Sequence, residues 1–357
     1  MPATIATFQI DLHQFLMPDG QLVSPEDTPP FAVDFDQLTE LYKLMVLTRS
    51  FDKKAIALQR TGKLGTYASC LGHEAAHVAI GSAMREEDCF APMYREYGAQ
   101  LYRGVRMSEI LLYWGGDERG SDFSGPAHDF AWCVPIATQC LHAAGAALAF
   151  KLREEPRVAV TVVGDGGSSK GDAMEALNAA SAFDLPLVAV IVNNQWAISV
   201  PRSKQNHAKT LAQKGIAAGI PAVQVDGNDL IASRWAMEEA LERARSGKGP
   251  SLIEMVTYRL SDHTTADDAT RYREAEEVEA AWHREPIRRL RRYLCEQGVW
   301  SDDRDQAYLQ EAAAAVEAEV AAYLEIGQPG VASMFDYMFA ELPHDLQEQK
   351  ARAMEDS

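Results

Sequence analysis

The segment 157–194 constrains the fold of this chain more than any other part of the sequence. It contains an apolar run over 157–164, a glycine-rich turn, a helical pattern over 173–183 and a second apolar run over 185–194. Continuous apolar runs of this kind are typical of strands buried on both faces, as in parallel sheets. The segment therefore predicts a βαβ unit, and with it an α/β protein.

Similar patterns continue on both sides of this unit. Apolar runs at 222–227 and 251–259 predict two further strands. Apolar residues at helical spacing predict helices over 36–62, 73–84 and 135–152. Strands that alternate with helices form a parallel sheet covered on both faces. We therefore expect an α/β fold built on a mostly parallel sheet with helices on both faces.

The sequence pattern divides the chain into three parts. Residues 1–35 contain turn formers and no sustained period, so we expect an N-terminal arm, with an unstructured tail as the alternative. Residues 36–275 carry the α/β pattern and form the main domain. Residues 276–357 are charged and helical, and predict a C-terminal helical extension packed on the same domain. The stretch 115–130, rich in Gly, Ser and Asp, predicts a long surface loop.

The composition limits the partners of this chain. It has 34 Lys and Arg against 52 Asp and Glu, a formal net charge of −18, so its overall field repels nucleic acid and anionic membranes. No apolar stretch is long enough for a membrane-spanning helix, and the N-terminus does not resemble a signal peptide. The five cysteines show no CxxC spacing, which favours a reducing cytoplasm. An anionic ligand would need a local binding device.

Such a device is predicted where the two strands of the βαβ unit end. The sequence GDGG at 164–167 follows the first strand, and Asn193 and Asn194 end the second, so both groups lie at one edge of the sheet. Ligands bind at this edge in open α/β sheets, and glycines let backbone amides approach a diphosphate closely. Asp165 and Asn194 offer the hard oxygen ligands that Mg²⁺ prefers.

Other phosphate-binding motifs do not fit this turn. A Rossmann fingerprint needs glycine at the position of Ser169, and a P-loop needs Gly-Lys-Ser/Thr where 169–171 reads Ser-Lys-Gly. A glycine turn without a ligand is the remaining structural alternative.

A wider set of motifs resembles one enzyme family. The GDG turn followed by the Asn pair is similar to the thiamin-diphosphate signature. From about Phe8 to near the end, the chain resembles the alpha subunits of the two-chain 2-oxo acid dehydrogenases. The motifs that carry this resemblance are RTGKLGTYASCLGHEA, PMYREYGAQLYRG, PIATQ, TLAQKGIAAGIPAVQVDGND and YRLSDHTTADDATRYR. The resemblance implies the thiamin-diphosphate-binding fold for residues 36–275.

The resemblance also implies a set of site residues. Those implied to contact thiamin diphosphate are Tyr94, Arg95, Val134, Ile136, Gly164, Asp165, Gly166, Gly167, Asn194, Trp196 and His263. Asp165, Asn194 and the backbone carbonyl of Trp196 are implied to hold Mg²⁺. His263 is implied to be the catalytic histidine that meets the lipoyl group, and as a loop histidine it could exchange protons near neutrality. The segment 135–139 holds a structural K⁺ in some relatives, with plain helix packing as the alternative.

The activity implied is oxidative decarboxylation of a 2-oxo acid, with reductive acyl transfer to the lipoyl domain of a dihydrolipoyl acyltransferase. The glutamate that activates the cofactor belongs to a beta subunit in this family, which implies an assembly of two alpha and two beta chains. The stretch 208–221 resembles the pyruvate enzymes of the family more closely, and this resemblance favours pyruvate as substrate. Branched-chain 2-oxo acids and acetoin remain alternatives, as does a cofactor-binding subunit without catalysis.

One further motif needs a separate explanation. His73, Glu74 and His77 satisfy HExxH on a predicted helix, the arrangement that places two zinc ligands and a glutamate base together in zinc proteases. No third ligand follows in the sequence, and relatives have a similar helix without a metal. We therefore interpret this match as coincidence.

Overall fold

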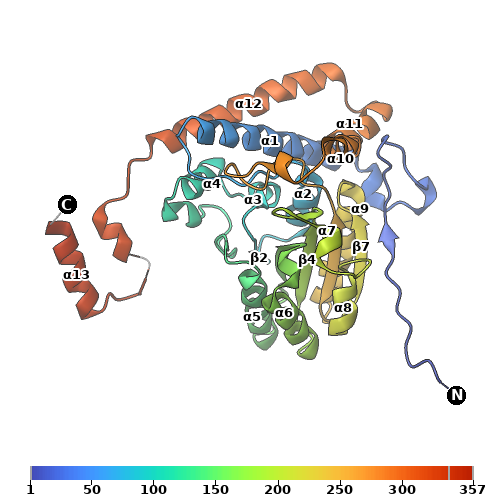
Figure 1. The fold of residues 1–357 in the computed structure, drawn as a ribbon, viewed down its shortest axis with the longest axis horizontal. Helices are drawn as coiled ribbons and strands as arrows, with labels where there is room; N and C mark the ends of the chain where they lie inside the picture. The colour runs from blue at the N-terminus through green and yellow to red at the C-terminus, as the bar shows by residue number, and fades with distance from the viewer. Residues whose placement is uncertain (1, 337, 356–357) are drawn as a thin grey trace.

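The computed structural model describes residues 2–336 and 338–355, and a six-stranded sheet lies at its centre (Figure 1). In spatial order the strands are β1 (Leu12–His13), β7 (Ala222–Asp226), β8 (Ser251–Val256), β4 (Leu187–Asn193), β3 (Ala159–Gly164) and β2 (Cys89–Ala91). Every neighbouring pair is parallel. The predicted α/β fold with a parallel sheet is confirmed.

Helices cover both faces of this sheet. The helices α5 (Thr138–Leu152) and α6 (Gly171–Ala182) pack on one face, and α2 (Glu74–Ala83) and α9 (Leu230–Arg245) on the other. Alternate residues of β4 enter opposite cores, because successive side chains of a strand point to opposite faces. This explains why the sequence of β4 is apolar throughout.

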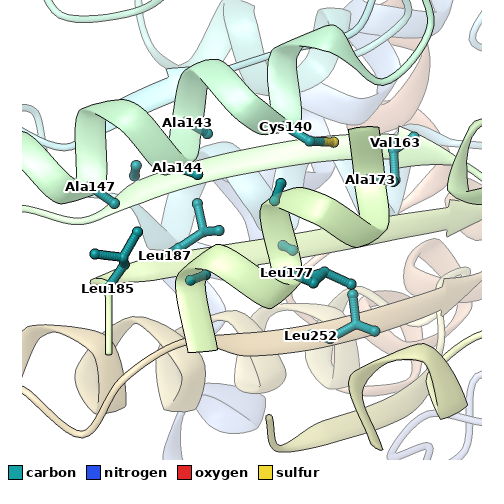
Figure 2. Packing of buried hydrophobic residues seen from close by; sticks show 14 of the residues in the cluster. Cys140, Ala143, Ala144, Ala147, Val163, Ala173, Leu177, Leu185, Leu187 and Leu252 are labelled. Atoms are coloured by element: carbon teal, nitrogen blue, oxygen red, sulfur yellow. The ribbon is translucent and has the colours of Figure 1, made fainter. Parts of the chain in front are cut away.

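The core between α5, α6 and the sheet is built from small residues (Figure 2). Alanines of both helices, including Ala143, Ala147 and Ala173, face leucines such as Leu187 and Leu252. Small helix residues let the backbones approach the strands closely, and the leucines fill the remaining space. This packing places α6, and therefore the glycine turn that precedes it, next to the sheet.

A further group of helices lies beyond α2. It comprises α1 (Phe35–Arg60), α3 (Tyr97–Tyr102), α4 (Met107–Trp114), α10 (Ala275–Trp282), α11 (Pro286–Glu296) and α12 (Asp302–Glu325). The long helix α12 packs along α1 and α4 (Figure 1). Arg49 of α1 forms ion pairs of 2.7 Å with Glu74 of α2 and with Glu285 at the start of α11. One buried guanidinium thus connects three helices.

The N-terminal arm joins the sheet rather than standing apart from it. Strand β1 pairs with β7, and the backbone amides of Phe15 and Leu16 each donate to the Asp229 carboxylate at 2.7 Å. Asp229 also caps α9 by accepting from backbone amides in the first turn of that helix. The same carboxylate therefore fastens the arm and begins a helix.

The remaining elements are short, apart from the last helix. They are η1 (Pro25–Asp27), η2 (Pro30–Val33), η3 (Glu118–Ser121), η4 (Gly167–Ser169), β5 (Trp196–Ala197), β6 (Val200–Pro201), α7 (Arg202–Gln205), α8 (Gln213–Ala218), η5 (Ala269–Arg271), η6 (Val331–Phe335) and α13 (His344–Glu355). Strands β5 and β6 form a small antiparallel hairpin, and η6 and α13 extend away from the body (Figure 1). No helix within 2–336 or 338–355 is long and apolar enough to cross a membrane.

Two predicted boundaries were wrong by three residues. The strand predicted over 251–259 ends at Val256. The helix predicted from Pro135 begins only at Thr138, because Ala137 has a left-handed backbone with φ of 66° that a continuing α-helix does not allow. The other predicted helices agree with the structure to within two residues: α1 covers Phe35–Arg60 and α2 covers Glu74–Ala83.

Candidate active site

Two polar residues leave the sheet side by side at its carboxyl edge. Gly164, the last residue of β3, pairs in register with Val192 near the end of β4. Asp165 and Asn194 follow these strands and are 1% and 9% exposed. Asn193 turns elsewhere, since its amide donates to the buried Glu254 carboxylate at 2.7 Å. The structure thus distinguishes Asn193, whose side chain is bound to Glu254, from Asn194, whose side chain makes other contacts.

Space explains the glycines of the turn. A Cβ added to Gly166 would lie 2.4 Å from the Cβ of Ala197 in the β5–β6 hairpin. A Cβ added to Gly167 would lie 2.7 Å from Val163 and 3.0 Å from Ile136. The backbone of Gly166 has φ of −63°, which any residue can adopt. Glycine is therefore needed here for close approach and not for an unusual backbone conformation.

The Asp165 carboxylate is buried without a cationic partner. Burial raises its pKa above the usual range, and the Gln205 side chain donates a short hydrogen bond to Oδ2. Within the described part of the chain no lysine or arginine forms an ion pair with it. The charges of Arg259 and Arg202 lower this pKa, but by less than burial raises it. A buried carboxylate without an ion-pair partner is costly, and a bound divalent cation would offset that cost. The donor set therefore fits Mg²⁺ chemically.

The other two predicted metal ligands lie beside it. Asn194 accepts a hydrogen bond at Oδ1 from the backbone amide of Trp196, at 3.1 Å. The Trp196 carbonyl receives a long contact of 3.4 Å from Arg259 Nη1. This backbone oxygen therefore retains a lone pair for a ligand.

A second group of predicted residues surrounds a cavity of about 750 Å³. Tyr94, Val134, Ile136 and His263 all contribute to its wall. Arg95 is buried behind this wall, where its guanidinium donates to the carbonyls of Ser69 and His263. The volume of this cavity lies within the range of ordinary ligand pockets, so it can hold an extended cofactor with part of a substrate.

His263 is held between two guanidinium groups. Its Nδ1 lies 3.3 Å from Arg95 Nη2 and 3.4 Å from Arg259 Nη1, and its backbone amide donates to Asp267 at 2.8 Å. Because guanidiniums only donate, Nδ1 must accept, and the ring proton sits on Nε2. Burial and the charges of Arg95 and Arg259 lower the His263 pKa to about 3. The expectation that it titrates near neutrality was wrong for this state, since two cations oppose its protonation.

The structure does not bring every predicted site residue to this one cavity. Trp196 lines a different cavity of about 770 Å³, together with Asn193 and Arg202. Val134 and Ile136 are 48% and 38% exposed, so part of the wall is open. In the segment 135–139, the Gln139 side chain donates a hydrogen bond of 2.6 Å to the Val162 carbonyl.

The sequence did not indicate two contacts in this region: that of Gln205 with Asp165 and that of His73 with Asn194. Gln205, the last residue of α7, contacts Asp165 from 40 residues away in the chain, and no motif signals this contact. His73 contacts Asn194 with its ring, at 3.1 Å. Zinc is not supported at HExxH, because the described residues contain no group of three or more His, Cys, Asp or Glu placed to hold a metal ion.

Comparison with known proteins identifies the class. Residues 42–330 match the family described as the dehydrogenase E1 component, and the chain belongs to this family of oxidoreductases. The family implies thiamin diphosphate as cofactor. The chain is 40% identical to the "Pyruvate dehydrogenase E1 component subunit alpha" of Staphylococcus aureus strain Mu50 over 343 residues, which cover 96% of this chain and 92% of the relative. The protein of that name from Acholeplasma laidlawii is also 40% identical, over 93% of this chain and 96% of its own length.

Proposed function

We propose that this chain is the alpha subunit of a pyruvate dehydrogenase, which decarboxylates pyruvate oxidatively and transfers the acetyl group to a lipoyl domain of a dihydrolipoyl acyltransferase. The relatives named above support pyruvate as the substrate. The observation that carries the proposal is the buried Asp165 carboxylate, which forms no ion pair among the described residues and lies with Asn194 at the carboxyl edge of the sheet.

The residues at this edge would hold the cofactor. Asp165, the Oδ1 atom of Asn194 and the Trp196 carbonyl would bind Mg²⁺, and the backbone amides at 164–167 would receive the diphosphate. When bound, thiamin diphosphate supplies the electron sink for decarboxylation. Tyr94 and Ile136 would line the space for its organic part. A structural K⁺ at 135–139 stays a prediction.

His263 would act through its Nε2 proton. Arg95 and Arg259 hold Nδ1, so the ring is oriented and the Nε2–H group is free to donate to a substrate or lipoyl group in the cavity. The same two cations disfavour a second ring proton. Binding of the anionic diphosphate near Arg95 would offset one of these charges and raise the His263 pKa toward neutrality.

We further propose that a beta subunit completes the site. It would supply the glutamate that activates the cofactor, in a heterotetramer of two alpha and two beta chains. Apolar side chains exposed on this chain support a covering partner: Phe130, Val134, Ile136 and Leu141 are each more than a third exposed. The composition further favours a reducing cytoplasm as the location.

The test is substrate-dependent reduction of an artificial electron acceptor by this chain co-purified with its beta partner, with thiamin diphosphate and Mg²⁺. We expect the highest kcat/KM with pyruvate, compared with 2-oxoisovalerate and acetoin, and at least a hundredfold loss in Asp165→Ala. Preference for another of these compounds would reject pyruvate and retain the class. A complex that binds the cofactor but reduces the acceptor with none of them would identify a non-catalytic subunit.

A further inference from the structure

His73 lies between the start of α2 and the proposed metal site. Its side chain is fully buried, with Nδ1 3.1 Å from the Cys70 carbonyl oxygen and Nε2 3.1 Å from Asn194 Nδ2. The Cys70 peptide is itself fixed, because its amide donates to the buried Asp52 carboxylate at 2.8 Å. The imidazole therefore bridges a fixed carbonyl and the amide of Asn194.

The two contacts determine the direction of the hydrogen bonds. A carbonyl oxygen only accepts, so Nδ1 must carry the proton and donate to Cys70. In the neutral ring Nε2 then has a lone pair, and the group that faces it must be a donor. That group is the NH₂ of Asn194, and its carbonyl oxygen Oδ1 must point to the other side of the amide.

A contact on that other side agrees with this orientation. The backbone N–H of Trp196 donates to Asn194 Oδ1 at 3.1 Å. If the amide were turned over, Oδ1 would face the Nε2 lone pair and the NH₂ group would face the N–H of Trp196. Both contacts would then be repulsive, so the turned orientation loses two hydrogen bonds.

We propose that His73 is a positioning residue that holds the Asn194 amide with Oδ1, its only metal-binding atom, toward the cation. This inference rests on the proposed Mg²⁺ site at Asp165 and Asn194. Residues that orient a metal ligand in this way typically change metal affinity by about 10- to 100-fold when they are removed.

His77, one turn further along in α2, provides a matched control. It is as buried as His73, and the two rings stack with centroids 5.4 Å apart. Neither ring nitrogen of His77 has a hydrogen-bond partner among the described residues. Replacement of His77 by leucine therefore changes the packing around His73 without removing a contact to Asn194.

The test measures Mg²⁺ affinity in the purified complex of this chain with its beta subunit, by calorimetric titration at saturating thiamin diphosphate. We expect His73→Leu to raise the Mg²⁺ Kd about 10- to 100-fold relative to His77→Leu. His73→Gln should remain within about threefold of wild type, because the Gln carbonyl can accept from Asn194. Unfolding temperatures without ligand separate a loss of packing from a loss of orientation.

Each outcome decides a different question. A Kd for His73→Leu within threefold of that for His77→Leu, or no rescue by His73→Gln, would refute the role of His73 and leave the proposed function intact. A wild-type complex that binds thiamin diphosphate without Mg²⁺ dependence would refute the metal site and this inference with it. If His73→Leu does not assemble, His73→Met replaces it, because methionine has a similar size and accepts hydrogen bonds only weakly.

Discussion

Replacing Gly166 with alanine tests whether the turn before α6 needs glycine for space. The new Cβ would lie 2.4 Å from the Cβ of Ala197, whereas carbon atoms in contact are about 3.5–4.0 Å apart. The β5–β6 hairpin must therefore move by roughly 1 Å, and overpacking of this kind costs about 1–3 kcal/mol. The helical φ and ψ of Gly166 favour alanine by about 0.5–1 kcal/mol. The net expectation is a loss of about 1–2 kcal/mol.

The hairpin carries Trp196, so the shift should also weaken cofactor binding. We expect Gly166→Ala to lower the urea midpoint and to raise the Kd for thiamin diphosphate about tenfold, the equivalent of about 1.4 kcal/mol. Gly171→Ala is the control, because its Cβ would meet only the flexible Glu175 side chain, at 3.5 Å. If both variants are equally stable and bind equally well, the steric explanation is wrong.

Two other predictions concern buried ionisable groups. Arg49→Leu leaves the carboxylates of Glu74 and Glu285 buried without their cation. We expect it to lower the free energy of unfolding, measured in urea, by about 3–5 kcal/mol. Lys43→Ala removes an exposed ion pair and should change that free energy by less than about 1 kcal/mol. Burial and the charges of neighbouring residues lower the pKa of His77 well below its usual value. The unfolded chain therefore binds a proton below about pH 6.5 that the folded chain does not. The free energy of unfolding consequently falls as the pH is lowered, by up to about 1.4 kcal/mol per pH unit. His77→Leu should flatten the stability profile between pH 7.5 and 5.5 by that amount, and an unchanged slope would contradict the pKa shift.

The sheet was predictable because its strands have a distinctive sequence. Strands β3 and β4 are buried on both faces, so they appear as continuous apolar runs, and the edge where they end follows from parallel pairing. That logic placed Asp165 and Asn194 together without any structure. The start of α5 was predicted three residues too early, at Pro135, and the cause is local. Ala137 has a left-handed backbone, which alanine rarely adopts and which no sequence rule predicts.

Contacts between distant segments account for the rest of what the sequence did not reveal. The low pKa of His263 depends on burial and on the charges of Arg95, which lies 168 residues away in the chain, and of Arg259. His73 contacts Asn194, which lies 121 residues away in the chain. In the sequence, His73 is noticeable only as part of the HExxH motif, which suggests a zinc site instead. A motif search registers the residues but not the environment that sets their protonation or orientation.

The N-terminal arm has a consequence for how the protein is made. The backbone amide of Phe15 donates a hydrogen bond to Asp229, which lies 214 residues later in the chain. At a synthesis rate of about 5–20 residues per second, the arm leaves the ribosome roughly 10–40 s before that partner exists. Strand β1 is therefore synthesised well before its partner β7, and until the two pair the edge of β7 that β1 covers has no neighbour.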